Sequence, residues 1–220
     1  MPEAGEGSAA ARAPAQELLA GEADWIAALK AVGAHGHARL ALLDSDACMA
    51  LLESCEGLSY RLARPLVGAS GREVRQDFDL TMEIPAPHPI RTLAASLSAA
   101  VSAAASRLAP NPLPQGIDFN DLIVQRYPRG SLGITPHRDH LRYDGLVILI
   151  TLAGAARFFV CEDRAGNGAV EIPAPPGGAI LLTAPGFAGG KARPFHFLDR
   201  VSQPRVSLGI RHDTRPGEPT

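Results

Sequence analysis

The sequence contains a series of short apolar runs: LIVQRY (122–127), LVILITL (146–152), RFFVC (157–161), AILLT (179–183) and VSLGIR (206–211). Two shorter runs cover 170–173 and 194–197. β-Branched and aromatic residues are frequent in these runs, glycine and proline separate them, and no helix-length pattern lies between them. Such a series predicts an antiparallel β-sandwich or jelly roll for the second half of the chain.

The first half of the chain carries helical patterns instead. Three helices are predicted, over 15–32, 45–55 and 89–108. Gly33 is expected to end the first helix, Asp44 suits the N-cap of the second, and Pro89 suits the first turn of the third. Between the second and third helices, an alternating pattern over 73–84 predicts one strand.

The domain organisation follows from these patterns. Residues 1–14 are small, polar and aperiodic, which predicts a disordered tail. We expect a single domain over 15–220, because no linker-like stretch divides it. Within it, 15–119 would supply helical support and a substrate lid, and 120–213 would form the core. The expected fold class is therefore α+β, mainly β, with a jelly roll braced by N-terminal helices.

The composition excludes several classes of protein. Hydrophobic residues make up 46% of the 220 residues, and 21 basic against 23 acidic residues give a net charge of −2. This composition excludes a wholly disordered chain and argues against a strongly basic nucleic-acid coat protein. Cys48, Cys55 and Cys161 show no CxxC spacing, and neither a secretory signal nor a membrane-spanning stretch is recognised. We expect a cytoplasmic protein with no membrane partner.

The segment TPHRDH (135–140) carries candidate metal ligands. His137 and Asp139 are two positions apart, so on an extended segment both side chains point to the same side. His196 offers a third donor from a later predicted strand. Two imidazoles and one carboxylate form a facial triad, which suits non-haem Fe(II) and leaves coordination positions open. The alternative is that His137 and Asp139 are hydrogen-bonded loop residues.

The last apolar run, RVSLGIR, carries polar residues at alternate positions. Arg205, Ser207 and Arg211 share one face of this predicted strand. Burying an arginine inside a sandwich is costly without an anionic partner. A dicarboxylate co-substrate would supply that partner through a bidentate contact with the guanidinium. The alternative is an arginine and serine pair on a solvated strand face.

Together with Gln125 and Tyr127 on the strand before the TPHRDH segment, these motifs resemble a known family. The half from 120 to 211 resembles the double-stranded β-helix of the Fe(II)/2-oxoglutarate-dependent dioxygenases, and in particular their AlkB-like branch. Two positions depart from that branch, because Gln125 and Ser207 stand where it usually has asparagine.

The resemblance implies a role for each matching residue. The metal ligands, and so the catalytic centre, would be His137, Asp139 and His196. The residues that bind 2-oxoglutarate would be Arg205, Ser207, Tyr127, Gln125 and Arg211, with the first three at the distal carboxylate. The implied reaction uses Fe(II), 2-oxoglutarate and O2, releases succinate and CO2, and most often hydroxylates its substrate. A carboxylate at Asp139 favours hydroxylation, demethylation or desaturation over halogenation.

The substrate is expected to be a small molecule. Nucleic-acid repair enzymes of the AlkB-like branch usually carry an acidic residue two positions after the metal-binding aspartate, and here that residue is Leu141. Candidate substrate contacts are Arg138, Arg142, Tyr143, Gln76 and Phe78. Two alternatives stay open: an AlkB-type oxidative demethylase of nucleic acid or protein, and a jelly roll that binds a ligand without turnover.

Overall fold

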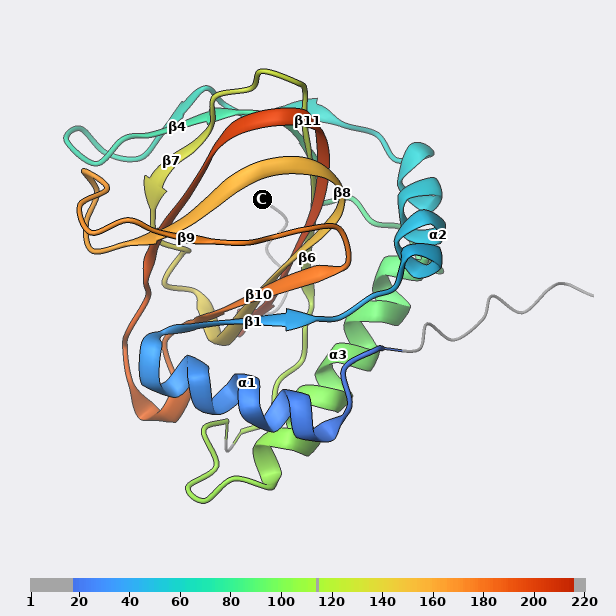
Figure 1. Ribbon diagram of the computed structural model, residues 1–220, viewed down its shortest axis with the longest axis vertical. Helices are drawn as coiled ribbons and strands as arrows, with labels where there is room; N and C mark the ends of the chain where they lie inside the picture. Colours follow the sequence, from blue (N-terminus) through green and yellow to red (C-terminus); the bar gives the residue numbers. More distant parts are fainter. Residues whose placement is uncertain (1–17, 114, 216–220) are drawn as a thin grey trace, which may run out of the picture.

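A computed structural model of the chain describes residues 18–113 and 115–215, so the predicted tail over 1–14 lies outside the described residues. The protein is mostly β, with a large antiparallel sheet and few helices (Figure 1). The elements are α1 (Glu22–His35), β1 (His37–Ala41), α2 (Ser45–Glu56), β2 (Arg61–Leu62), β3 (Leu66–Val67), β4 (Val74–Asp77), β5 (Asp79–Thr81), α3 (Pro89–Ser106), β6 (Asp121–Tyr127), β7 (Gly133–His137), β8 (Tyr143–Cys161), β9 (Val170–Ile172), β10 (Gly178–Thr183), the 3-10 turn η1 (Phe187–Gly189) and β11 (Phe195–Asp213).

Two long strands, β8 and β11, organise the sheet. Its main path runs β1-β10-β8-β11-β6-β5-β2, with every pair antiparallel. Each long strand changes partner along its length: β8 pairs first with β10 and later with β9, and β11 pairs first with β7 and later with β6. Strands β4 and β3 continue outward from β7. The long strands thus belong to two groups of strands and arch between them (Figure 1).

The two long strands correct the predicted element boundaries. The runs over 146–152 and 157–161 belong to one strand, and so do those over 194–197 and 206–211. The sequence shows interruptions where the strands bend. At Gly154 the backbone has φ 81°, and a Cβ there would collide with the Pro204 carbonyl oxygen. A glycine is therefore required where β8 crosses the irregular part of β11.

Alternation along the strands divides the apolar residues into two cores. On β8, Leu146, Ile148 and Ile150 join the core between the sheet and the helices, whereas Val147 packs in the second core. The second core lies on the opposite face of the sheet, where Phe158 of β8 also packs. A strand buried on both faces reads as a continuous apolar run. The residues of the candidate site lie on the face of the sheet that carries the second core.

The helices lie along one side of the sheet (Figure 1). The helix predicted over 15–32 begins only at Glu22, because Gly21 forms its N-cap and its amide donates to the Asp24 carboxylate at 2.9 Å. It continues past Gly33 and ends at Gly36, which has φ 78°. The other two helices lie close to their predicted positions. No helix within the described residues is long and apolar enough to cross a membrane.

The strand predicted over 73–84 is two strands, β4 and β5. Strand β4 pairs with β7, whereas β5 pairs with β6, so the chain passes from one group of strands to the other at Phe78. The buried side chain of Phe78 packs against the Tyr127 ring, with 4.9 Å between the ring centroids. Strand β1, which pairs with β10, was not predicted.

Candidate active site

The two candidate histidine ligands face each other across neighbouring strands. His137 ends β7 and is the register partner of His196 on β11, with 4.3 Å between the ring centroids. In each ring Nδ1 lies near the carbonyl oxygen two residues earlier, at 2.9 Å from Thr135 and 3.2 Å from Pro194. A carbonyl only accepts, so Nδ1 donates and Nε2 keeps its lone pair. Both histidines are therefore held in the tautomer that binds metal through Nε2.

Asp139 completes this group from the loop after β7. Its Oδ2 lies 3.6 Å from Nε2 of His196. Burial alone would raise the pKa of Asp139, but the neighbouring His196 and the charge of Arg211 lower it below its usual value. Burial and the neighbouring His196 lower the pKa of His137 to about 3. At neutral pH the group therefore contains an ionised carboxylate and a neutral His137 imidazole, as metal binding requires.

The donor set fits Fe(II) by its chemistry. Two imidazole nitrogens and one carboxylate form the set typical of non-haem iron sites, and all three residues line one pocket. Within the part of the chain that the structure describes, no group of three or more His, Cys, Asp and Glu side chains is placed so that it could hold a metal ion, and this includes the candidate triad. The fit therefore depends on donor chemistry and proximity.

A single pocket contains all eight predicted metal and 2-oxoglutarate residues. Its lining is Gln125, Tyr127, Ile134, His137, Asp139, Leu149, Phe158, His196, Leu198, Arg205, Ser207 and Arg211. The other four residues are apolar. The pocket is thus lined by eight polar or charged residues and by four apolar residues, which we call its apolar wall.

Arg205 is a buried cation without a carboxylate partner. Arg205 is only 5% exposed. Its guanidinium donates to Ser207 Oγ at 2.8 Å and to Thr151 Oγ1 at 2.9 Å. Its guanidinium carbon also lies 5.6 Å from the centroid of the Tyr127 ring. Among the described residues, no carboxylate lies within ion-pairing distance of Arg205. A buried charge in this state requires an anionic ligand for compensation.

Strand β6 brings two more polar groups beside Arg205. Tyr127 is its register partner, and Gln125 pairs with Ser207. Burial raises the pKa of Tyr127 to about 12, so its hydroxyl stays protonated and able to donate a hydrogen bond. Thr151 was missed by the sequence analysis. Its hydroxyl is the only polar side-chain group in the apolar run LVILITL, but threonine is common in strands and by itself does not indicate a site.

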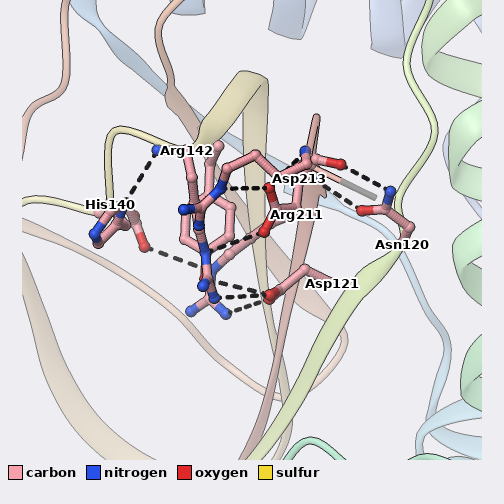
Figure 2. A network of polar contacts seen from close by, with 9 residues as sticks. Asn120, Asp121, His140, Arg142, Arg211 and Asp213 are labelled. Carbon is pink, nitrogen blue, oxygen red and sulfur yellow. Dashed lines mark hydrogen bonds and ion pairs between the residues drawn. The ribbon is translucent and has the colours of Figure 1, made fainter. Parts of the chain in front are cut away.

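Arg211, in contrast, belongs to a network of paired charges that includes Asp121, Arg142 and Asp213 (Figure 2). Arg211 Nε lies 3.5 Å from Asp139 Oδ1, and its Nη1 lies 3.2 Å from Asp121 Oδ1. The second oxygen of Asp121 lies 3.2 Å from Arg142 Nη2, and Arg142 Nε lies 3.2 Å from Asp213 Oδ2. The network joins β6, β11 and the loop after β7, and it holds that loop in place. Asp121 was also missed, although it directly precedes the predicted strand LIVQRY.

None of the five candidate substrate contacts lines this pocket. Arg142 and Tyr143 are engaged in the network of Figure 2, where the Tyr143 hydroxyl lies 3.0 Å from Arg142 Nη2. Phe78 is buried in the second core. Gln76 donates through Nε2 to the Arg64 carbonyl oxygen at 3.1 Å.

Arg138 is exposed, and its guanidinium carbon lies 4.1 Å from the centroid of the Phe195 ring. Strand β7 ends at His137, so Arg138 lies in the loop after it, and its side chain does not line the pocket that contains the two candidate ligands on either side of it.

Comparison with protein-family models and with curated proteins finds no match for this chain. Solved structures do match. A Pseudomonas putida prolyl-4-hydroxylase is 17% identical with a TM-score of 0.58, over 87% of this chain and 99% of that one. A Burkholderia pseudomallei oxidoreductase of the 2OG-Fe(II) oxygenase family is 17% identical with a TM-score of 0.59, over 90% and 93%.

A prolyl hydroxylase from Trichoplax adhaerens, solved in complex with a peptide fragment of hypoxia inducible factor, is 11% identical. Its TM-score is 0.60, over 87% of this chain and 90% of that one. At these identities the likeness concerns the fold. The chain therefore has a mostly β fold similar to that of the 2-oxoglutarate and iron oxygenases.

Proposed function

We propose that this protein is an Fe(II)- and 2-oxoglutarate-dependent dioxygenase that hydroxylates a small molecule and releases succinate and CO2. The observation that carries the proposal is the unpaired, buried Arg205 in the same pocket as His137, Asp139 and His196. A keto acid with two carboxylates suits both parts of this pocket. One end can chelate a metal held by the three candidate ligands, and the other can neutralise the arginine. The shared fold agrees with this assignment.

In this proposal His137, Asp139 and His196 hold Fe(II). The bound metal supplies the activation of O2, coupled to decarboxylation of the keto acid. Arg205, positioned by hydrogen bonds to Ser207 and Thr151, binds the distal carboxylate of 2-oxoglutarate.

In this proposal the remaining pocket residues position the co-substrate and the Asp139 carboxylate, and they shield the reacting groups from water. The Tyr127 hydroxyl would donate to the distal carboxylate, and Gln125, which lines the same pocket, would lie near the keto-acid end and the metal. Arg211 orients the Asp139 carboxylate through their contact at 3.5 Å. The apolar wall of Ile134, Leu149, Phe158 and Leu198 excludes water from the reacting groups.

The finer assignments also belong to this proposal. The two groups of strands would form one jelly roll, within a single domain over 15–220. The relation to the AlkB-like branch depends on the sequence motifs alone. The substrate class, a small molecule, depends on Leu141 in place of an acidic residue and on the absence of a basic excess in the chain.

The test is an anaerobic titration of metal-free protein with Fe(II) and 2-oxoglutarate. We expect the visible charge-transfer band of an iron-chelated keto acid in the wild type. The band should vanish in His196→Ala and require far more 2-oxoglutarate in Arg205→Met. Arg129→Gln, an exposed residue outside the pocket, is the matched control. Absence of the band from folded wild-type protein at saturating Fe(II) would refute the proposal.

A further inference from the structure

A second groove lies beside the candidate active site. It is bounded by the end of α1 and by the segment 184–194, which connects β10 to β11 (Figure 1). Of the 14 described residues that line it, three are the cations Arg138, Lys191 and Arg193, and none is acidic. The groove is thus a concave surface of one sign of charge, although the chain as a whole has a net charge of −2.

Among the described residues, no carboxylate lies within ion-pairing distance of these three cations, although the charge of Asp139 acts on Arg193 from farther away. Arg138 contacts the Phe195 ring, and Arg193 donates through Nη1 to the backbone carbonyl oxygen of Asp139. Lys191 is exposed and has no side-chain partner among the described residues. Arg193 is influenced by the like charge of Arg138 and by the opposite charge of Asp139. An anion bound in the groove would reduce the repulsion between the two guanidiniums.

We propose that this groove binds the phosphate group of a small molecule. Three cations that line one groove suit a dianion, whereas a polynucleotide requires a stripe of cations along a surface. Arg138 lies between His137 and Asp139 in the sequence, and Arg193 contacts the Asp139 backbone. The bound phosphate is therefore adjacent to the loop of the candidate metal site. That the phosphorylated molecule is also the one oxidised depends on the proposed function, whereas phosphate binding does not.

The test is a calorimetric titration of the metal-free full chain with inorganic phosphate at constant ionic strength. We expect saturable binding that weakens about fivefold or more in Lys191→Gln and in Arg138→Gln. The chain offers matched controls, because Lys30 is its only other lysine and Arg129 is exposed outside the groove. Lys30→Gln and Arg129→Gln should bind phosphate as the wild type does.

A second series separates the two pockets. Phosphate binding should survive in Arg205→Met, and the iron and 2-oxoglutarate band should survive in Lys191→Gln. Phosphate binding without any such band would refute the proposed function and leave the groove assignment standing. Tighter binding of O-phosphoserine than of inorganic phosphate would support a phosphate carried on a molecule, and equal binding would support the site with the free ion as its ligand.

Three results would overturn the groove assignment. They are absence of saturable binding in the wild type, equal weakening in the control variants, and loss of phosphate binding only in Arg205→Met. A single-stranded oligonucleotide that binds more tightly than phosphate, with affinity falling steeply as salt rises, would also overturn it in favour of a nucleic-acid interface.

Discussion

Arg205 and Arg211 lie on the same strand and line the same pocket, but their charges are balanced differently. Arg205 donates to the hydroxyls of Ser207 and Thr151, and among the described residues it has no carboxylate partner. Arg211 contacts the carboxylates of Asp121 and Asp139. An arginine whose charge is met within the protein braces the structure, whereas one whose charge is left unmet is available to a ligand. The alternating polar residues of β11 thus include one arginine that braces the fold and one that is available to a ligand.

The largest expected effect would come from Arg205→Met. Without the guanidinium the pocket loses its only unpaired buried cation among the described residues, so we expect 2-oxoglutarate affinity to fall at least about 100-fold. The free energy of unfolding without ligand should stay unchanged or rise, because an uncompensated buried charge is removed. Anaerobic titration and chemical denaturation measure the two quantities.

Arg211→Met is the matched variant for this experiment, six positions along the strand. It leaves the Asp121 and Asp139 carboxylates with one cation fewer, so we expect the free energy of unfolding to fall by about 3 kcal/mol. Equal stability losses in Arg205→Met and Arg211→Met would contradict the distinction between the two arginines.

The next effect concerns Asp121, which pairs with both Arg211 and Arg142. The three side chains of these two ion pairs are 9–14% exposed. Asp121→Asn removes the charge that both guanidiniums share, and we expect a loss of about 2–3 kcal/mol in stability by chemical denaturation. The control is Asp79→Asn, whose partner Arg126 is 44% exposed. That pair should contribute less than about 1 kcal/mol, and a larger loss there than in Asp121→Asn would refute the role of the network.

A smaller effect is expected at Thr151. Thr151→Val keeps the shape of the side chain but removes the hydroxyl that accepts from Arg205 at 2.9 Å. Arg205 would then be less well oriented, and we expect 2-oxoglutarate to bind about tenfold more weakly. Thr81→Val provides the control, since Thr81 is buried outside the pocket. Unchanged affinity in Thr151→Val would show that Ser207 alone positions the guanidinium.

The difference between Thr151 and Arg205 also explains what the sequence could predict. Arginine within an apolar strand is costly enough to be noticed, and alternation then placed Ser207 and Arg211 on its face. A threonine is common in strands, so Thr151 carried no such signal. Its role depends on the register that pairs Thr151 with Ser207, which only the structure gives.

The bends and the charge network were beyond prediction for a similar reason. Gly154 could equally end a strand or bend one, and the Pro204 backbone that decides between them is 50 positions away in the sequence. Arg142 was predicted to contact substrate because it follows the TPHRDH segment closely. Its pairing with Asp121 and Asp213 depends on three segments that meet only in the folded chain.

The smallest effect is expected at the edge of the network, where Asp213 contacts Arg142 and Arg215. Partial burial would raise the pKa of Asp213, but the Arg215 amide and the Arg142 charge lower it below its ordinary value of 3.8. A carboxyl with a lowered folded-state pKa stabilises the protein above its unfolded pKa and loses that contribution as the pH falls through the folded value. Thermal unfolding between pH 6 and pH 3 should therefore show a shallower fall of Tm in Asp213→Asn than in the wild type. Parallel pH profiles would mean that solvent screens this end of the network and that the bracing of Asp139 depends on Asp121 alone.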